Sequence, residues 1–382
     1  MKNKYIYFDN AATSYPKPPQ VISAMQNFMR NIGANPGRSG HSLSVDAGRV
    51  LFETRELISS FFNVGNSDNV VFTLNATHAL NIALKGILKS GDHVITSSWE
   101  HNAVMRPLNW LAKHKSINFT QIKNKDVQGF DKASFQTSIR PETRLVVLTH
   151  ASNVTGQILP IKEIGKICME KRIVFLVDCA QTAGVLPIDM QKDKIDLLTF
   201  TGHKGLFGPQ GTGGLCINNR TDIESLAQGG TGSRSEHEEQ PEFLPDKLEA
   251  GTPNTPGITG LRAGIEFILK TGFDTIYNHK QKLSKTMLDG LRNFKEIEIY
   301  NSDKCCPGII SFNIRDRSPA EIAHILDKEY GILTRPGLQC APSAHKTINT
   351  FPEGTLRISL SYFNNKEEID CLIGVLEKII RK

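Results

Sequence analysis

Apolar residues follow two alternating patterns over the first half of the chain. Short β-rich apolar runs lie at 70–74, 93–98, 118–122, 145–150, 174–179, 197–201 and 214–217. Between them, segments such as 79–88, 103–113 and 161–171 repeat apolar positions at helical spacing. Strands that alternate with helices predict an α/β fold with a mostly parallel, seven-stranded sheet flanked by helices. Ligands of such sheets bind at the carboxyl ends of the strands, so the loops after these runs should hold the site.

The pattern changes after residue 228. Residues 228–256 are polar, rich in glycine and proline and without periodicity, which by itself is typical of a surface excursion. Beyond them, the spacing predicts helices at 260–270 and 277–293, strands at 308–314 and 356–361, and a last helix from about 366. A chain of 382 residues exceeds one typical hydrophobic core. We therefore expect a large domain over 16–256 and a smaller α/β domain formed by 1–15 and 257–382.

Composition and charge narrow the class of protein. The chain is 39% apolar and 22% charged, as ordinary globular proteins are. Its formal charge of +6 is modest, and no basic run is interleaved with aromatic residues, so we expect no nucleic-acid partner. No apolar segment suits a signal peptide or a membrane span. The seven cysteines are scattered, which predicts neither a disulfide scaffold nor a metal site and fits a reducing cytoplasm.

The strongest chemical signal is a pair of opposite charges at two predicted strand ends. Asp178 ends the apolar run FLVD, and Lys204 follows the run LLTFTGH. A buried charge needs a partner. The pair forms either a structural salt bridge or a site for pyridoxal phosphate, in which the lysine holds the aldehyde as an imine and the aspartate pairs with the pyridine nitrogen.

Further polar residues fall at the same predicted edge of the sheet. Thr77 and His78 open a helix after the first strand, where free N–H groups suit a phosphate, although a threonine there is often only a helix cap. His101 could stack on the ring or merely cap a helix. The remaining candidates are Gln181 for the phenolate oxygen, Asn153 for the ring oxygen or a substrate carboxylate, and Thr201 and His203 for the phosphate.

These motifs resemble those of the class V aminotransferase-like enzymes of the cysteine desulfurase and selenocysteine lyase type. The resemblance runs through YFDNAATSYPKP, RSGHSLSVDAGRVLFETRELISSFFN, SNVTGQILPI, VDCAQTAG, TGHKGLFGPQGTGGL, RPGLQCAP and LRISLSYFNNKEEID. It implies the fold type I architecture of pyridoxal-phosphate enzymes and a homodimer with active sites at the subunit interface.

The resemblance also implies a role for each matching residue. Lys204 would be the Schiff-base lysine, Asp178 the partner of the pyridine nitrogen, Gln181 the ligand of the phenolate oxygen, and His101 the stacking residue. Thr77, Thr201 and His203 would hold the phosphate, with Thr231 contributed by the partner subunit, which makes 228–256 an interface loop. Asn153 and Arg357 would hold the substrate carboxylate, which the planar fork of an arginine matches.

The same resemblance places the nucleophile at Cys340, in a loop bounded by glycine and proline. The loop resembles the short RxGxxCA branch, whose members often carry histidine directly before the cysteine. This chain has Gln339 there, so the activation of the Cys340 thiol lacks a neighbouring imidazole. The segment AHKTINT that follows has no role by resemblance. The pair Cys305-Cys306 is expected to be either redox-sensitive or part of an inert loop.

The function expected is removal of sulfur from L-cysteine, leaving alanine and a persulfide on Cys340. Three alternatives stay open from the sequence: a selenocysteine lyase on the same scaffold, a thiol-independent aminotransferase, and a non-enzymatic protein that has kept the fold. A sulfur or selenium acceptor protein is an expected partner of a cysteine desulfurase or a selenocysteine lyase.

Overall fold

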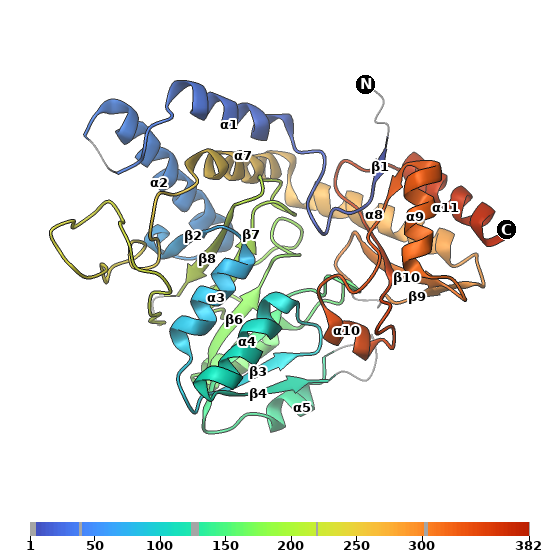
Figure 1. The fold of residues 1–382 in the computed structure, drawn as a ribbon, viewed down its shortest axis with the longest axis horizontal. Coiled ribbons are helices and arrows are strands. Elements are labelled where there is room, and N and C mark those ends of the chain that lie inside the picture. The colour runs from blue at the N-terminus through green and yellow to red at the C-terminus, as the bar shows by residue number, and fades with distance from the viewer. Residues whose placement is uncertain (1–4, 38–39, 124–129, 219–220, 302–304, 382) are drawn as a thin grey trace.

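A computed structural model describes residues 5–37, 40–123, 130–218, 221–301 and 305–381 (Figure 1). Its centre is a seven-stranded sheet in the order β2-β8-β7-β6-β5-β3-β4. The strands are β2 (Val70–Thr73), β3 (His93–Ser97), β4 (Asn118–Ile122), β5 (Thr143–Thr149), β6 (Val174–Asp178), β7 (Leu197–Thr201) and β8 (Gly213–Ile217). Strand β8 is antiparallel to both of its neighbours, while the other pairs are parallel. The expected mostly parallel, seven-stranded sheet is confirmed.

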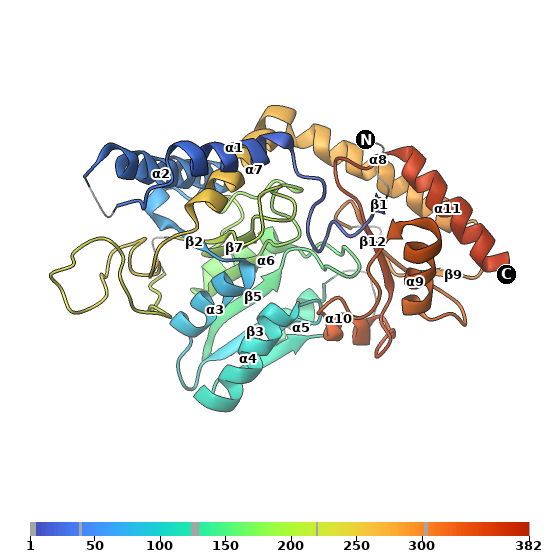
Figure 2. The ribbon, with the colours of Figure 1, turned by 45° about the horizontal axis from the view of Figure 1, so that its top comes forward.

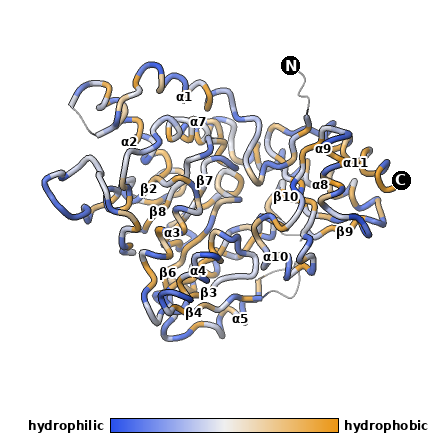
Figure 3. The backbone as a smooth tube through the Cα atoms, in the orientation of Figure 1, coloured by the Kyte–Doolittle hydropathy of each residue, from blue (hydrophilic) through white to orange (hydrophobic). Residues whose placement is uncertain are grey.

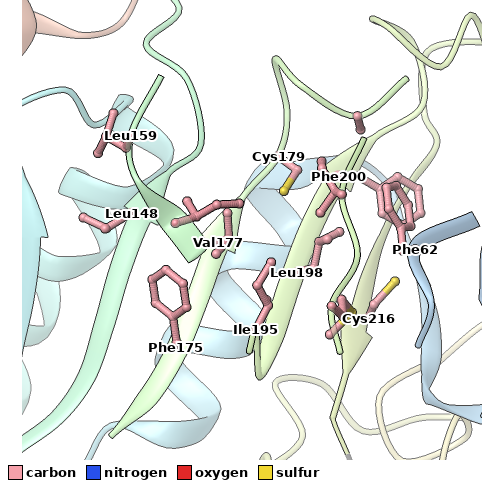
Figure 4. Close-up of a cluster of buried hydrophobic side chains, with 14 of the residues drawn as sticks. Phe62, Leu148, Leu159, Phe175, Val177, Cys179, Ile195, Leu198, Phe200 and Cys216 are labelled. Carbon is pink, nitrogen blue, oxygen red and sulfur yellow. The ribbon is translucent and has the colours of Figure 1, made fainter. Parts of the chain in front are cut away.

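Successive residues of the central strands point to opposite faces of the sheet and enter two separate cores. Val177 and Leu198 belong to one core, while Leu176 and Leu197 belong to the other. This alternation is the two-residue period of a strand buried on both faces. Figure 3 shows the sheet as the most hydrophobic part of the tube, and Figure 4 shows the first core around Val177.

Helices cover each face of the sheet. The core that contains Val177 is closed by α2 (Ser42–Phe62), α6 (Ile161–Lys171) and α7 (Thr255–Thr271), with α1 (Pro19–Asn31) packed outside on α7. The opposite core is closed by α3 (Ala76–Ile87) and α4 (Asn102–Lys115). A short helix, α5 (Lys132–Thr137), and the 3₁₀ turn η1 (Ser67–Asn69) complete this half.

A second, smaller core lies at the other end of the molecule. A three-stranded antiparallel sheet contains β9 (Ile297–Ile299), β10 (Ile309–Ile314) and β12 (Leu356–Ser359) in the order β12-β10-β9. It packs with α8 (Phe273–Leu291), α9 (Pro319–Tyr330) and α11 (Lys366–Arg381), as Figure 2 shows. Between β11 (Ile332–Leu333) and β12 lies α10 (Pro342–Thr347).

The start of the chain belongs to this second core. Strand β1 (Ile6–Tyr7) pairs in parallel with β11, and Phe8 is fully buried among the small-core residues. The division into domains of 16–256 and of 1–15 with 257–382 stays a prediction. Across the described residues, no helix is long and apolar enough to cross a membrane.

Candidate active site

A cavity of about 80 Å³ opens at the carboxyl ends of the parallel strands. Its walls come from the loops that follow β2, β3, β5, β6 and β7. They include eight of the predicted site residues: Thr77, His101, Asn153, Asp178, Gln181, Thr201, His203 and Lys204. The edge of the sheet that the sequence pattern indicated is therefore where these side chains meet.

Asp178 and Lys204 lie on neighbouring strands but form no salt bridge with each other within the described residues. Asp178 is 4% exposed, and one of its oxygens accepts from the Ala180 N–H at 2.9 Å. Burial raises the pKa of Asp178, which the Ala180 N–H and Lys204 oppose. Burial lowers the pKa of Lys204 to about 8, against the opposing pull of Asp178. The two charges thus face a shared cavity instead of neutralising each other, which disfavours a purely structural ion pair.

One end of the cavity is suited to an anion. Asn75 caps α3 by accepting from the His78 N–H at 2.9 Å, and Ala76 and Thr77 of this first turn line the cavity. The helix N-terminus therefore presents N–H groups to the cavity. Nδ1 of His203 is buried without a hydrogen-bond partner. Burial lowers the pKa of His203 to about 4, helped by Lys204 and Lys17, so its ring is neutral near pH 7.

His101 caps a helix, which is one of the two roles considered from the sequence, and it also lines the cavity. It is the N-cap of α4, and its Nδ1 accepts from the Ala103 N–H at 3.0 Å. The proton of the neutral ring is therefore on Nε2. Burial lowers the pKa of His101 to about 4, with Lys204, Arg357 and Arg106 acting in the same direction. The helix cap fixes a neutral imidazole at the cavity wall.

Arg357 lies 3% exposed behind the cavity, in an ion pair with a residue from the start of the chain. Its Nη2 donates to Asp9 at 2.9 Å, and its Nη1 donates to the carbonyl of Asn153 at 2.9 Å. Its Nε is buried without a partner. The side-chain amide of Asn153 donates to the carbonyl of Gln339 at 2.6 Å, so Asn153 links the arginine to the cysteine loop.

Cys340 is exposed and lines a wide groove of about 360 Å³. The groove shares Thr77, His101 and Ala103 with the cavity, so the thiol stands at the entrance of the site. The groove continues over α4 toward Arg106 and Trp110. The carbonyl of Cys340 accepts from the Asn102 N–H at 2.7 Å, which ties the loop to the start of α4.

Three of the predicted residues form hydrogen bonds with residues that do not line this cavity. The His78 ring accepts from the Leu74 N–H at 3.4 Å and lines a different pocket. Thr231 is also absent from the walls of this chain's cavity; its hydroxyl lies 3.2 Å from that of Ser233. Gln181 donates its side-chain amide to the Ala11 carbonyl at 3.1 Å. The remaining candidates converge on the cavity, the groove or the Arg357 pair.

Sequence reasoning missed three polar residues at the site. Asp9 holds Arg357, and Lys17 donates to the His203 carbonyl at 2.8 Å. Glu100 is completely buried beneath the cavity, where both of its oxygens accept from the Thr149 N–H. Glu100 directly precedes the predicted residue His101, and Asp9 and Lys17 lie within the motif YFDNAATSYPKP, so each of the three had a signal in the sequence. Asp9 and Lys17 come from a segment far away in sequence from the residues that they contact.

The site fits pyridoxal phosphate on observations of this chain alone. It offers an amine of lowered pKa and a buried carboxylate that do not pair with each other. It also offers a helix N-terminus and the unpartnered His203 nitrogen for a phosphate. Within the described residues, no cluster of three or more histidine, cysteine, aspartate or glutamate side chains could hold a metal ion. Fold and site together define an enzyme built around a pyridoxal-phosphate cofactor.

Comparison with known proteins gives the family. The model of the family "Aminotransferase class-V" matches residues 6–372, and the chain belongs to this family. A probable cysteine desulfurase of Pyrococcus abyssi is 36% identical over 100% of this chain and 96% of its own length. One of Methanothermobacter thermautotrophicus is 35% identical over 98% of this chain and 94% of its own.

Solved structures agree with this assignment. The apo structure of the cysteine desulfurase from Thermococcus onnurineus NA1 is 33% identical, with a TM-score of 0.93 over 99% of this chain and 95% of that chain. The cysteine desulfurase CsdA from Escherichia coli is 25% identical, with a TM-score of 0.89 over 100% and 96%. The family and the fold expected from the sequence motifs are confirmed.

Proposed function

We propose that this protein is a pyridoxal-phosphate-dependent cysteine desulfurase that transfers the sulfur of L-cysteine to Cys340. The observation that carries this proposal is the position of the exposed Cys340 thiol at the entrance of the cavity that holds Lys204 and Asp178. The full-length relatives described as cysteine desulfurases support the same activity.

Each of the cavity residues would contact a different part of the cofactor. When bound, the cofactor supplies an electron sink for the substrate's α-carbon. Lys204 would hold the cofactor's aldehyde and would then move the proton at the substrate's α-carbon, for which its lowered pKa makes the amine available near neutral pH. Asp178 would pair with the pyridine nitrogen, and His101 would stack on the ring. Gln181 and Asn153 lie within the cavity walls to contact ring oxygens.

Different residues would bind the phosphate and the substrate. Thr77, Thr201 and His203, with the start of α3, would hold the phosphate. Arg357, with Asn153 beside it, binds the substrate carboxylate. Because Arg357 is already paired with Asp9, that carboxylate joins or replaces an existing partner instead of neutralising a free charge.

The transfer step balances without another reactant. The thiolate of Cys340 attacks the substrate sulfur, the carbon–sulfur bond breaks, and its electron pair stays on carbon, which takes up a proton to give L-alanine. Cys340 is left as a persulfide. An acceptor must later remove this sulfur, and we propose an acceptor protein as partner. We also propose a homodimer, in which Thr231 reaches the partner subunit's phosphate site, and a cytoplasmic location, which suits seven free thiols.

Selenocysteine lyase is the second candidate. A selenol ionises more easily than a thiol, and a selenolate leaves more easily than a thiolate. An aminotransferase would need no thiol, and the placement of Cys340 argues against it. The desulfurase relatives favour cysteine as the substrate.

The test compares the wild type with Lys204→Ala and Cys340→Ala, with Cys371→Ala as the control for loss of an exposed thiol. Lys204→Ala should lose the visible absorbance of the bound cofactor. Cys340→Ala should keep that absorbance and lose sulfide and alanine formation from L-cysteine, while Cys371→Ala behaves as wild type. Retained cysteine turnover by Cys340→Ala would contradict the proposal. Activity on selenocysteine alone would favour the lyase.

A further inference from the structure

The segment AHKTINT, to which the sequence assigned no role, contains a histidine that is completely buried beside the cysteine loop. His345, in α10, is 0% exposed. Its Nε2 lies 2.8 Å from Oε1 of Gln339, the residue directly before Cys340. Its Nδ1 lies 2.7 Å from the Thr350 hydroxyl. An imidazole is therefore present next to the cysteine loop, but one side chain further away than in relatives with histidine at position 339.

The hydrogen bonds determine how this network is oriented. The Gln339 amide nitrogen is 3.2 Å from the Arg335 carbonyl and 2.9 Å from the Thr355 carbonyl, and both of these only accept. Oε1 of Gln339 must then be the acceptor that faces His345, so His345 donates from Nε2. Burial lowers the pKa of His345 to about 4, so the neutral ring leaves Nδ1 to accept from Thr350. Both the nitrogen and the oxygen of the Gln339 side-chain amide therefore form hydrogen bonds.

This network supports an unfavourable backbone conformation. Gln339 and Cys340 have φ values of 41° and 60°, two consecutive left-handed residues with side chains. Such a conformation is unfavourable for residues that carry a Cβ. The Gln339 and Cys340 carbonyls are also fixed, by Asn153 and by the Asn102 N–H. The turn buries the Gln339 side chain to 6% exposure and leaves Cys340 facing the groove.

We propose that His345, acting through the side chain of Gln339, is a positioning residue that holds the Cys340 thiol at the entrance of the active site. This inference rests on the proposed role of Cys340. Gln339 takes no part in proton transfer, because its side chain is hydrogen-bonded to Arg335, Thr355 and His345 while Cys340 lines the groove. The buried glutamine and the histidine six residues later form one unit, which explains both departures of this chain from the family pattern.

The experiment uses the cofactor-loaded protein in a Cys371→Ala background, so that Cys340 is the only cysteine classed as exposed. The variants are His345→Ala, His345→Gln, Gln339→Ala and Gln339→His. The control is His93→Ala, because His93 is also buried between two hydroxyls but lies at the far end of β3. The readouts are the rate at which iodoacetamide modifies Cys340 between pH 6 and 9, the cofactor absorbance, and kcat and KM for L-cysteine.

We expect His345→Ala to lower kcat on the order of ten- to a hundredfold, as a displaced reacting group does, with KM and the cofactor absorbance close to wild type. Its alkylation rate should change several-fold. His345→Gln, whose amide can donate to Gln339, should recover most of the lost kcat and most of the wild-type alkylation behaviour. Gln339→His should lose as much as Gln339→Ala, because an imidazole cannot make the three bonds of the amide to Arg335, Thr355 and His345. His93→Ala should change stability but not alkylation.

Several outcomes would overturn the inference. Alkylation and kcat within twofold of wild type in His345→Ala would do so, and so would a Gln339→His variant more active than wild type. If His345→Ala does not fold, Thr350→Val removes only the hydroxyl that orients the ring, and the same readouts apply. Failure of the proposed function is distinguishable, because Cys340→Ala would then retain cysteine turnover whatever the alkylation data show.

Discussion

Glu100 makes the stability of this protein depend on pH in a direction that can be worked out from the structure. The side chain is 0% exposed, and burial raises its pKa from 4.5 to about 8 despite hydrogen bonds from Ser97 and Thr149. Between those two values the folded protein holds a proton that the unfolded chain releases. Stability therefore falls as pH rises through this window.

The magnitude follows from the width of the window. Each pKa unit corresponds to about 1.4 kcal/mol, so the loss from pH 4.5 to 8 is on the order of 3–5 kcal/mol. Glu100→Gln is neutral in both states, and its amide can replace the protonated carboxyl between Ser97 and the Thr149 N–H. We expect the variant to match wild type near pH 4.5 and to become increasingly more stable toward pH 8.

The assay is urea unfolding of wild type and Glu100→Gln at several pH values from 4.5 to 8, with Glu170→Gln as the control at an exposed glutamate of α6. The control should follow the wild-type profile. If Glu100→Gln were less stable than wild type at pH 8, the carboxylate would be ionised in the folded protein, and the reasoning about burial would be wrong.

Three further predictions concern the surroundings of the site. Lys280 is 8% exposed, its side chain makes no hydrogen bond or ion pair among the residues that the structure describes, and it lines the cavity behind Lys204. Because burial lowers its pKa, Lys280→Met should stabilise the protein by about 1–3 kcal/mol below pH 10, which calorimetry can measure. Uptake of pyridoxal phosphate by cofactor-free protein needs the neutral Lys204 amine, so its rate should rise with pH and level off above about 8, which visible absorbance can follow; a rise that continued to pH 10 would contradict this. Gly354 has a φ of 87°, and Gly354→Ala would place a Cβ 2.1 Å from the Gly337 oxygen. The variant should therefore displace the cysteine loop, lower kcat, and lower the unfolding free energy by about 1–3 kcal/mol.

Much of the large sheet could be predicted because its strands are buried on both faces. Continuous apolar runs such as the one before Asp178 are strong local signals, and the seven expected strands match β2 to β8 to within about two residues. The same logic placed eight polar residues on one cavity, because the ends of parallel strands share an edge.

Several elements that sequence reasoning did not predict are short or depend on distant partners, although the longer helices α1, α2 and α9 were not predicted either. Strands β1 and β11 contain two residues each, and α10 contains six, too few to show a period. The Asp9–Arg357 pair joins residues 348 positions apart, and no local pattern reports it. The role of Gln339 was hidden for a related reason, since its partners Thr355, which directly precedes β12, and His345 of α10 meet it only in the fold.

The pairing of residues 9–11 with residues 357–359 determines when the active site can assemble during synthesis. Asp9 and the Ala11 amide bind Arg357 and Ser359, which are made 348 residues later. A growing chain can form the large sheet and most of the cofactor cavity while residues 9–11 still lack these partners. Arg357, which we propose binds the substrate, is fixed only after the small core closes on residues 6–11, so cofactor binding can precede competence for catalysis.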